Sequence, residues 1–340
     1  MEEKMHRKKT FLLSIIVLLF SPAYGKQLAI ATSKKIIIWN SDDWQQEKVL
    51  DTTTCIESIA FSPDGTRLAM SCTINEKITI WNTNDWKREK VLDTKSDIES
   101  IAFNPDGTHL AAATNNQIRI WNTSNWKPIK NLKADRFVKQ IAFSPDGKYL
   151  AAGTKAKNTE GADLIIWNTN TWKPIKNWRA KYYSVDSVAF SPDGKLLAAA
   201  HGPNVTIWNT DTWNQKKILE KPEGALGLVT FSPDGKYLVR CSSYDNEITI
   251  WKTIDWSLEK VLKTKTDLPS AAFSPNKNLL ALADGKDVTI WNTKKWNVEK
   301  KLQGDQWVKS MAWKPIDPTA QFGTKIRKKR KYFDIKIKTK

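Results

Sequence analysis

The chain has 340 residues, of which 40% are hydrophobic and 26% are charged, a composition that excludes a collagen-like, wholly disordered or polytopic membrane protein. Two values are unusual for a globular protein, namely 17 tryptophans and a formal net charge of +18. The three cysteines, Cys55, Cys72 and Cys241, are too few for a disulfide scaffold, so burial must hold the core together. Whether Cys55 and Cys72 pair stays open.

Residues 1–25 have the pattern of a signal peptide. A basic stretch, residues 1–10, precedes the apolar residues 11–20 and a small-x-small cleavage site at Ala23 and Gly25. The alternative is an uncleaved membrane anchor, but this apolar stretch covers only about half of a bilayer core. No cysteine follows the site, which disfavours a lipid anchor. We therefore expect cleavage after Gly25 and a periplasmic or secreted protein.

Residues 26–315 form a sevenfold repeat. The sequence Phe-Ser-Pro-Asp-Gly, or a variant of it, begins at Phe61, Phe103, Phe143, Phe190, Phe231 and Phe273, with a worn copy at Trp313. Each repeat also has two tryptophans five residues apart: Trp39 and Trp44, Trp81 and Trp86, Trp121 and Trp126, Trp167 and Trp172, Trp208 and Trp213, Trp251 and Trp256, Trp291 and Trp296. A period of about 40 residues, with a turn signal every ten or so, predicts blades of four short antiparallel strands.

One repeat shows how the strands are read. Residues 56–61, 67–72, 77–81 and 86–92 are the predicted strands a, b, c and d, and Pro63-Asp64-Gly65 supplies the turn between the first two. Charged residues and prolines in strand d are typical of an outer edge that must not pair.

The two ends of the chain complement each other. The repeat region opens with strands b, c and d, at residues 27–32, 35–39 and 44–50, and its last strand, at residues 307–313, supplies the missing strand a. We therefore expect an all-β, seven-bladed β-propeller of four-stranded antiparallel blades, closed by three N-terminal strands plus one C-terminal strand.

The Phe-Ser-Pro-Asp-Gly turn and the Ile-Trp-Asn end of strand c resemble the WD-repeat family of β-propellers over about residues 26–315. The family's Trp-Asp is Trp-Asn in six repeats and Trp251-Lys252 in one, and the family's Gly-His pair is absent. The family's buried His-Asp-Ser-Trp hydrogen bonds are therefore not carried over, and the second tryptophans are candidates for packing instead. The resemblance implies a non-catalytic scaffold that binds a protein partner on the loop-bearing face.

The repeats differ at the fourth residue before the strand-a aromatic, near the rim of the channel. The resemblance implies that the charged residues at this position are candidate partner contacts: Glu57, Glu99, Lys139, Asp186 and Lys309. The alternative is that these charges neutralise one another around a solvated channel. Tyr182 and Tyr183, in a basic loop, are further candidates, although the segment can also be a plain loop.

Catalysis has little support in the sequence. His109 and His201 have no second ligand at metal spacing, and the chain has no phosphate-binding loop or nucleophile elbow. We expect no catalytic residue, metal or cofactor. One alternative is a lactonase-like or hydrolase-like propeller enzyme with Glu57, Glu99 and Asp186 clustered around an ion. The other is binding of a glycan or envelope polymer through strand-d tryptophans, which would then lie exposed in a row.

Residues 316–340 are predicted to be a basic, disordered tail. The last twenty residues contain nine Lys or Arg and one Asp, for a charge of +8. An anionic membrane surface or polymer is a candidate partner for Arg327, Lys328, Lys329, Arg330 and Lys331, whereas nucleic acid is disfavoured. The alternative is a solvated tail that only aids solubility. We expect the protein to be a monomer.

Overall fold

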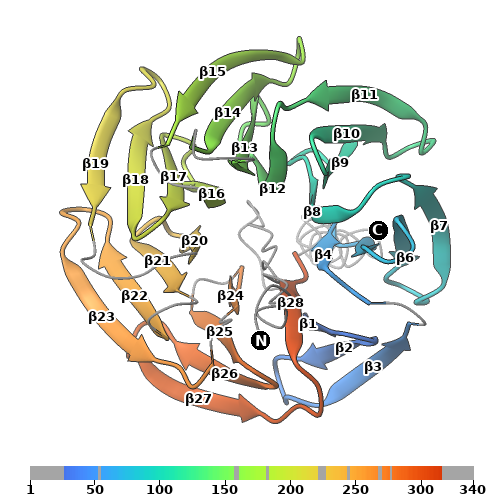
Figure 1. The fold of residues 1–340 in the computed structure, drawn as a ribbon. Coiled ribbons are helices and arrows are strands. Elements are labelled where there is room, and N and C mark those ends of the chain that lie inside the picture. Colours follow the sequence, from blue (N-terminus) through green and yellow to red (C-terminus); the bar gives the residue numbers. More distant parts are fainter. Residues whose placement is uncertain are drawn as a thin grey trace, which may run out of the picture.

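The computed structural model describes residues 27–52, 55–156, 161–180, 184–220, 227–242, 246–266, 270–275 and 278–315. In this part of the chain, 28 strands form seven four-stranded antiparallel sheets arranged as a ring (Figure 1). The all-β, seven-bladed propeller predicted from the repeat is confirmed. No helix in the described ranges is long and apolar enough to span a membrane.

Each blade runs from the channel outwards in the order a, b, c, d (Figure 1). Blade 1 consists of β28 (Val308–Trp313), β1 (Gln27–Thr32), β2 (Lys35–Asn40) and β3 (Gln46–Asp51). Blade 2 consists of β4 (Ser58–Phe61), β5 (Arg67–Cys72), β6 (Lys77–Asn82) and β7 (Arg88–Asp93). Blade 3 consists of β8 (Ile98–Phe103), β9 (His109–Thr114), β10 (Gln117–Asn122) and β11 (Pro128–Lys133).

The remaining blades repeat this order. Blade 4 consists of β12 (Phe137–Phe143), β13 (Tyr149–Lys155), β14 (Asp163–Asn168) and β15 (Lys173–Arg179). Blade 5 consists of β16 (Val185–Phe190), β17 (Leu196–His201), β18 (Asn204–Asn209) and β19 (Gln215–Leu219). Blade 6 consists of β20 (Gly227–Phe231), β21 (Tyr237–Ser242), β22 (Glu247–Lys252) and β23 (Leu258–Lys263), and blade 7 of β24 (Ser270–Phe273), β25 (Leu279–Asp284), β26 (Asp287–Asn292) and β27 (Asn297–Leu302).

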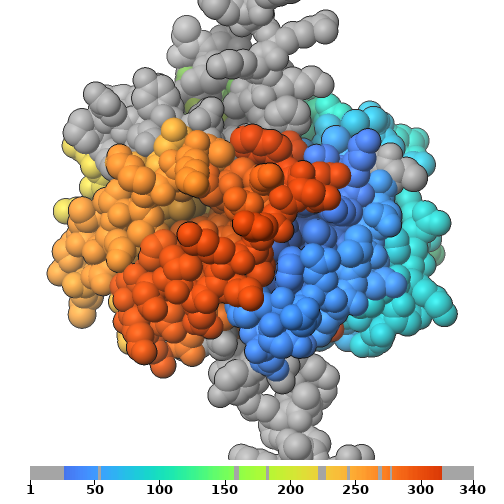
Figure 2. All heavy atoms as spheres, turned by 90° about the horizontal axis from the view of Figure 1, so that it is seen from below, coloured from blue at the N-terminus to red at the C-terminus, as the bar shows by residue number. Residues whose placement is uncertain are grey.

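The ring is closed through blade 1, where β28 pairs antiparallel with β1 and places Trp313 opposite Leu28. In Figure 2 the first described strands, in blue, and the last, in red, lie together on one flank of the molecule. The residues after β28 continue the contact into blade 2, because a Cβ on Gly65 would lie 2.9 Å from the carbonyl oxygen of Pro315. The predicted closure by three N-terminal strands and one C-terminal strand is confirmed.

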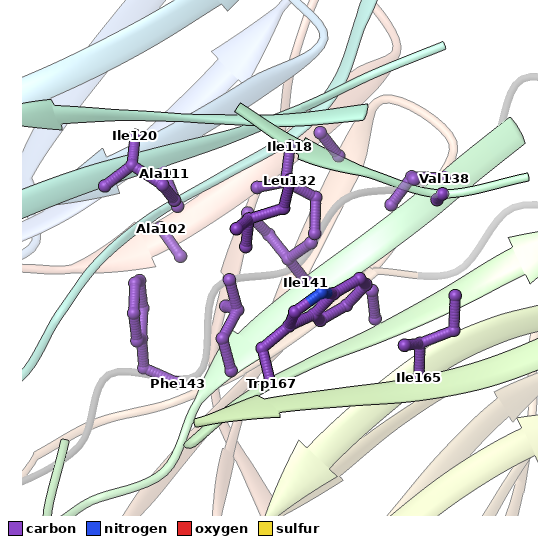
Figure 3. Packing of buried hydrophobic residues seen from close by; sticks show 14 residues of the cluster. Ala102, Ala111, Ile118, Ile120, Leu132, Val138, Ile141, Phe143, Ile165 and Trp167 are labelled. Carbon is purple, nitrogen blue, oxygen red and sulfur yellow. The ribbon is translucent and has the colours of Figure 1, made fainter. Parts of the chain in front are cut away.

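The apolar core lies between blades. Each of the seven clusters of buried side chains combines residues of two neighbouring sheets. Between blades 3 and 4, for example, Ile120 and Ala111 meet Ile141, Phe143 and Trp167 (Figure 3). Burying one large apolar side chain stabilises the folded state by about 1.5–3 kcal/mol. A blade without a neighbour would lose this contribution from each such side chain on its open face.

The repeated turn residues form one hydrogen-bonded unit. In blade 2 the Ser62 hydroxyl donates to an Asp64 carboxylate oxygen at 2.5 Å, and Gly65 takes the left-handed φ of 69° that the turn requires. The Thr83 hydroxyl, from the Trp-Asn-Thr end of strand c, donates to the Gly65 carbonyl at 2.6 Å. The same threonine-to-glycine bond recurs in blades 3 to 6, so this threonine ties the c–d turn to the a–b turn.

The second tryptophan of each repeat lies before strand d, and the prediction that strand d starts at this residue is wrong. Trp86 has a φ of 55° and β7 begins at Arg88; all seven equivalent tryptophans have φ between 50° and 63°. The chain reverses here because the Asn82 side-chain oxygen accepts a hydrogen bond from the Asn84 backbone N–H at 2.8 Å. Five further repeats use their strand-c asparagine in the same way, so this residue has a structural role in the c–d turn.

The rings of these tryptophans contact the preceding blade. Trp213 packs edge-on against Tyr149 with a centroid distance of 5.1 Å, and Trp172 and Trp296 make matching contacts with His109 and Tyr237. None of the seven second tryptophans is exposed: Trp296 is buried and the others are partly buried. The row of exposed rings expected for polymer binding is therefore absent, and these side chains link the blades near the outer edge.

Truncation after Asp305 tests the closure of the ring. It removes β28, including the fully buried side chains of Met311 and Trp313, and exposes the apolar residues that pack against them. Each of these side chains contributes about 1.5–3 kcal/mol, so we expect a large fall in the urea midpoint or insoluble protein. The control is truncation after Pro315, which removes the tail but keeps β28. Equal stability of the two proteins would contradict non-covalent closure.

Trp213→Ala tests the links between blades. The substitution removes the contacts of Trp213 with Tyr149 and Trp178, and we expect a loss of about 2–4 kcal/mol in the free energy of unfolding. Trp307→Ala is the control, because the Trp307 side chain is 53% exposed. If urea denaturation gives the same loss in the free energy of unfolding for both variants, Trp213 stabilises the protein no more than an exposed tryptophan does.

Candidate functional site at the axial channel

Four of the five charged candidates are the extra residue of a β-bulge. In blade 3, Ile98 pairs with Thr114 and Ser100 with Ala113, so Glu99 has no partner in the ladder. The same shift occurs at Lys139, Asp186 and Lys309, and Glu57 directly precedes β4. A bulge re-aims the side chain of the extra residue. The bulge could have been recognised in the sequence, because two adjacent polar residues, as in Ile-Glu-Ser-Ile, interrupt the alternation of apolar and polar residues in strand a.

The polar residue after each bulge forms a hydrogen bond with the backbone of the neighbouring blade. The Gln140 side-chain oxygen accepts a hydrogen bond from the Val188 backbone N–H at 2.6 Å. Ser187 accepts in the same way from Val229 at 3.1 Å, and Ser100 and Ser310 also accept from the next blade. These bonds satisfy backbone donors on the inner edges of the sheets, which would otherwise be buried without partners.

Two of the charged candidates form an ion pair across blades. The Lys139 ammonium lies 3.1 Å from a Glu99 carboxylate oxygen, and the two side chains are 5% and 16% exposed. The ammonium also lies 5.2 Å from the centre of the Phe137 ring. Loss of one partner would leave the other charge buried, so this pair belongs to the inner wall of the ring rather than to a freely solvated surface.

The carboxylate of Glu57 lies within electrostatic reach of three other blades. Burial and the nearby Glu99 carboxylate raise the pKa of Glu57 to about 7, although Lys309 and Lys139 act to lower it. Lys139 is two blades away from Glu57 around the ring, so the bulge side chains converge on the axis.

Asp186 is buried, with 2% of its surface exposed. One carboxylate oxygen accepts from the Ser184 hydroxyl at 2.6 Å, and the other has no hydrogen-bond partner among the described residues. Burial raises the pKa of Asp186 to about 6, against the Ser184 hydrogen bond and the charges of Lys139, Lys155 and Arg240. Asp186 thus belongs to the same group of charges as Lys139.

Arg240, which was not among the residues predicted from the sequence, brings blade 6 into this group of charges. Arg240 is 1% exposed and lies on β21, where other repeats have alanine or another apolar residue. A Cβ on Gly227 would lie 3.2 Å from the Arg240 Nε, so the glycine leaves room for the guanidinium. An arginine in the apolar segment Tyr-Leu-Val-Arg-Cys is the signal that could have revealed it.

A second buried ion cluster also escaped prediction. Asp163, at the start of β14, lies 2.9 Å from the Arg136 Nε and 3.3 Å from the Arg179 Nε. Asp163 and Arg136 are buried, whereas the Arg179 side chain is 59% exposed. Two cations on one carboxylate offset its desolvation, and the cluster ties the d–a loop before blade 4 to strands c and d of that blade.

The remaining predicted residues fall into two groups. Tyr182, Tyr183, the predicted signal peptide and the predicted basic tail, including Arg327–Lys331, lie outside the described residues. His109 packs against Trp172, and the His201 ring lies 2.7 Å from the Thr206 hydroxyl, so both have structural contacts.

The described residues contain no group of three His, Cys, Asp or Glu side chains that could hold a metal ion, so the ion-centred cluster of Glu57, Glu99 and Asp186 is not found there. Cys55, Cys72 and Cys241 are all free thiols. Cys241 is buried, as expected for a strand-b residue, and its burial raises the pKa of the thiol to about 12.

Two family models match parts of the chain. The family described as eukaryotic translation initiation factor eIF2A matches residues 14–171, and the WD domain, G-beta repeat, matches residues 172–209 and 216–252. No curated protein matches. Among solved structures, the chain is similar to Kuenenia stuttgartiensis hydrazine synthase, with a TM-score of 0.68 and 18% sequence identity over 77% of this chain and 90% of that chain. This likeness shows the fold alone.

Glu57→Gln tests whether the buried Glu57 carboxyl group makes the stability of the protein depend on pH. The pKa of Glu57 is about 7 in the folded protein against an ordinary value of 4.5. Between these pH values the folded state binds more protons than the unfolded state, so stability falls as the pH rises. We expect Glu57→Gln to remove a large part of this fall, on the order of 2 kcal/mol between pH 5 and pH 7.5 by urea denaturation. Lys309, Lys139 and Glu99 face this carboxyl group and stay unchanged.

The exposed Glu299→Gln is the control for this experiment and should leave the pH dependence of the wild-type protein intact. A Glu57→Gln protein with the same pH dependence as the wild type would show that the Glu57 carboxyl group is ionised alike in the folded and unfolded states.

Proposed function

Because this chain is a seven-bladed β-propeller of the WD-repeat type, we propose that it is a non-catalytic scaffold that binds a protein partner at the channel end where the charged bulge residues lie. One observation carries the proposal. The repeated residues are engaged in turns and blade contacts, whereas the bulge position varies in charge: it is acidic in blades 2, 3 and 5, basic in blades 1 and 4, and uncharged in blades 6 and 7. Variation at one structural position within an invariant frame is what specific recognition requires.

The bulge residues contribute in two ways. Glu57, Glu99 and Lys309 are partly exposed and are the residues that a partner would contact directly. Lys139 and Asp186 are buried, and they position the others through the Lys139–Glu99 ion pair and through the charge around them. Mixed charges at close quarters discriminate between partners because a misplaced like charge is costly.

The non-catalytic role is part of the proposal. WD-repeat proteins are typically non-catalytic, which supports it. The solved structure reported above is named a hydrazine synthase, an enzyme, and at 18% identity that name does not transfer an activity to this chain.

The proposal also includes the place where the protein acts. The pattern of residues 1–25 favours export, and the basic residues Arg327–Lys331 favour attachment to an anionic membrane surface or polymer. A monomeric propeller with a free channel end is the state that we expect to bind the partner.

The experiment compares captured proteins from extracts of the native host. The double variant Glu57→Gln, Lys309→Gln removes one negative and one positive charge from the channel end, and we expect it to lose the wild-type partner by at least about tenfold in quantitative mass spectrometry. The control is Asp211→Asn, Lys294→Gln, which makes the same charge changes in the exposed c–d turns. Equal enrichment with both variants would overturn the proposed binding surface, and melting curves check that each variant is folded.

A further inference from the structure

The outer edges of blades 3 and 4 form a basic surface. Strand d has nearly the same sequence in these blades, Trp-Lys-Pro-Ile-Lys-Asn-Leu-Lys and Trp-Lys-Pro-Ile-Lys-Asn-Trp-Arg. Figure 1 shows β11 and β15 as the outermost strands of neighbouring blades. We call the exposed lysines of these two edges the basic wall: Lys127, Lys130, Lys133, Lys173 and Lys176.

The two segments that carry the basic wall, residues 127–133 and 173–179, contain no acidic residue. Four other blades have a glutamate three residues after the second tryptophan: Glu47, Glu89, Glu259 and Glu299. In blades 3 and 4 the same position holds Ile129 and Ile175. Strand d of blades 3 and 4 therefore has no carboxylate beside its lysines, whereas strand d of blade 2 has Glu89, which forms an ion pair with Arg67 of strand b.

The lysines of the wall are available for binding. All five are exposed, and none has an acidic partner within ion-pair distance among the described residues. Other surface lysines do have such a partner, for example Lys263 with Glu247 and Lys252 with Glu259. Unpaired surface ammonium groups are only hydrated, so an anionic ligand does not have to break an existing ion pair.

The central lysine of each edge strand lies on the side that is turned towards the next blade. Lys130 pairs with Ile120, which packs between blades 3 and 4, so Lys130 lies on the side of β11 that is turned towards blade 4. Lys176 pairs with Ile166, which packs between blades 4 and 5, and so lies on the side turned towards blade 5. The positive charge consequently continues around the outside of the ring instead of forming one flat patch.

This arrangement selects among polyanions. The edges of β11 and β15 have no exposed aromatic ring among the described residues, because Trp178 is partly buried against Trp208 and Trp213, so bases would find no stacking surface. A membrane surface is planar, and proteins that bind to it insert apolar groups. The edges of β11 and β15 lie on the convex outside of the ring, and their exposed large apolar residues are Ile129 and Ile175. A flexible chain of carboxylates can follow the curve, and lysine ammonium groups bind it without a fixed planar geometry.

We propose that the basic wall is a binding site for an acidic polysaccharide, which runs around the outer edges of blades 3 and 4 and is held by the five lysines. The site lies on the outside of the ring, away from the channel end, so it does not depend on the partner-binding role proposed above.

Binding of a polyuronate oligosaccharide to the full-length chain, measured by calorimetry at several salt concentrations, tests this site. The wall variant replaces all five lysines of the wall by glutamine. The control replaces five strand-d or pre-strand-d lysines of blades 1, 2 and 7 by glutamine: Lys48, Lys87, Lys90, Lys300 and Lys301. Both variants lose the same charge and keep the tail, so only the location of the charge differs.

We expect the wall variant to bind at least about tenfold more weakly at low salt and with a flatter dependence on salt, and the control to stay within about twofold of the wild type. Equal losses in the two variants, or no binding by the wild type, would overturn the proposal. A wall variant that loses affinity for single-stranded DNA or for phosphatidylglycerol vesicles, but not for polyuronate, would also overturn it by assigning another class of ligand. Thermal melting checks that both variants are folded.

Discussion

The constraint on which this molecule depends is that no blade can bury its apolar faces alone. Every cluster of buried side chains lies between two sheets, so a blade at an open end would expose half of its core. The pairing of β28 with β1 removes that open end, and it does so with strands from the two ends of the described chain. The stability of each interface is therefore linked to closure of the whole ring.

The demands of this frame account for most of the repeated residues. The serine, aspartate and glycine of the a–b turn, the threonine and asparagine of the c–d turn, and the two tryptophans all have a defined contact within a blade or with its neighbour. Repetition in this sequence thus reports structure. Two kinds of position escape the frame, the bulge residues at the channel and the outer faces of strand d, and both vary in charge from blade to blade.

The charged bulges connect the stability of the fold with the binding of a partner that we propose. Burying a carboxylate at the inner wall costs free energy, and this burial raises the pKa of Asp186 to about 6. Burial and the nearby Glu99 carboxylate together raise the pKa of Glu57 to about 7. The Lys139–Glu99 pair and Arg240 offset part of that cost. A folded protein that holds such groups near the axis is sensitive to pH and to any charged group that a partner presents there.

The fold class, the number of blades and the pairing of the two chain ends could be predicted from the sequence, because turn residues and alternating apolar residues act locally and recur seven times. The left-handed tryptophans, the room that Gly227 leaves for Arg240, the buried Lys139–Glu99 pair and the basic wall could not. The Lys139–Glu99 pair depends on which residue of the neighbouring blade lies opposite, 40 residues away in the chain. The contact between Gly227 and Arg240 depends on the register of one hairpin, and the left-handed tryptophans depend on the geometry of the turn before strand d. The basic wall depends on which strands lie outermost and on which of their lysines have no acidic neighbour among the described residues. The sequence by itself determined the ring, and only the tertiary structure decided which charges are buried together at its axis and which remain unpaired on its outer edge.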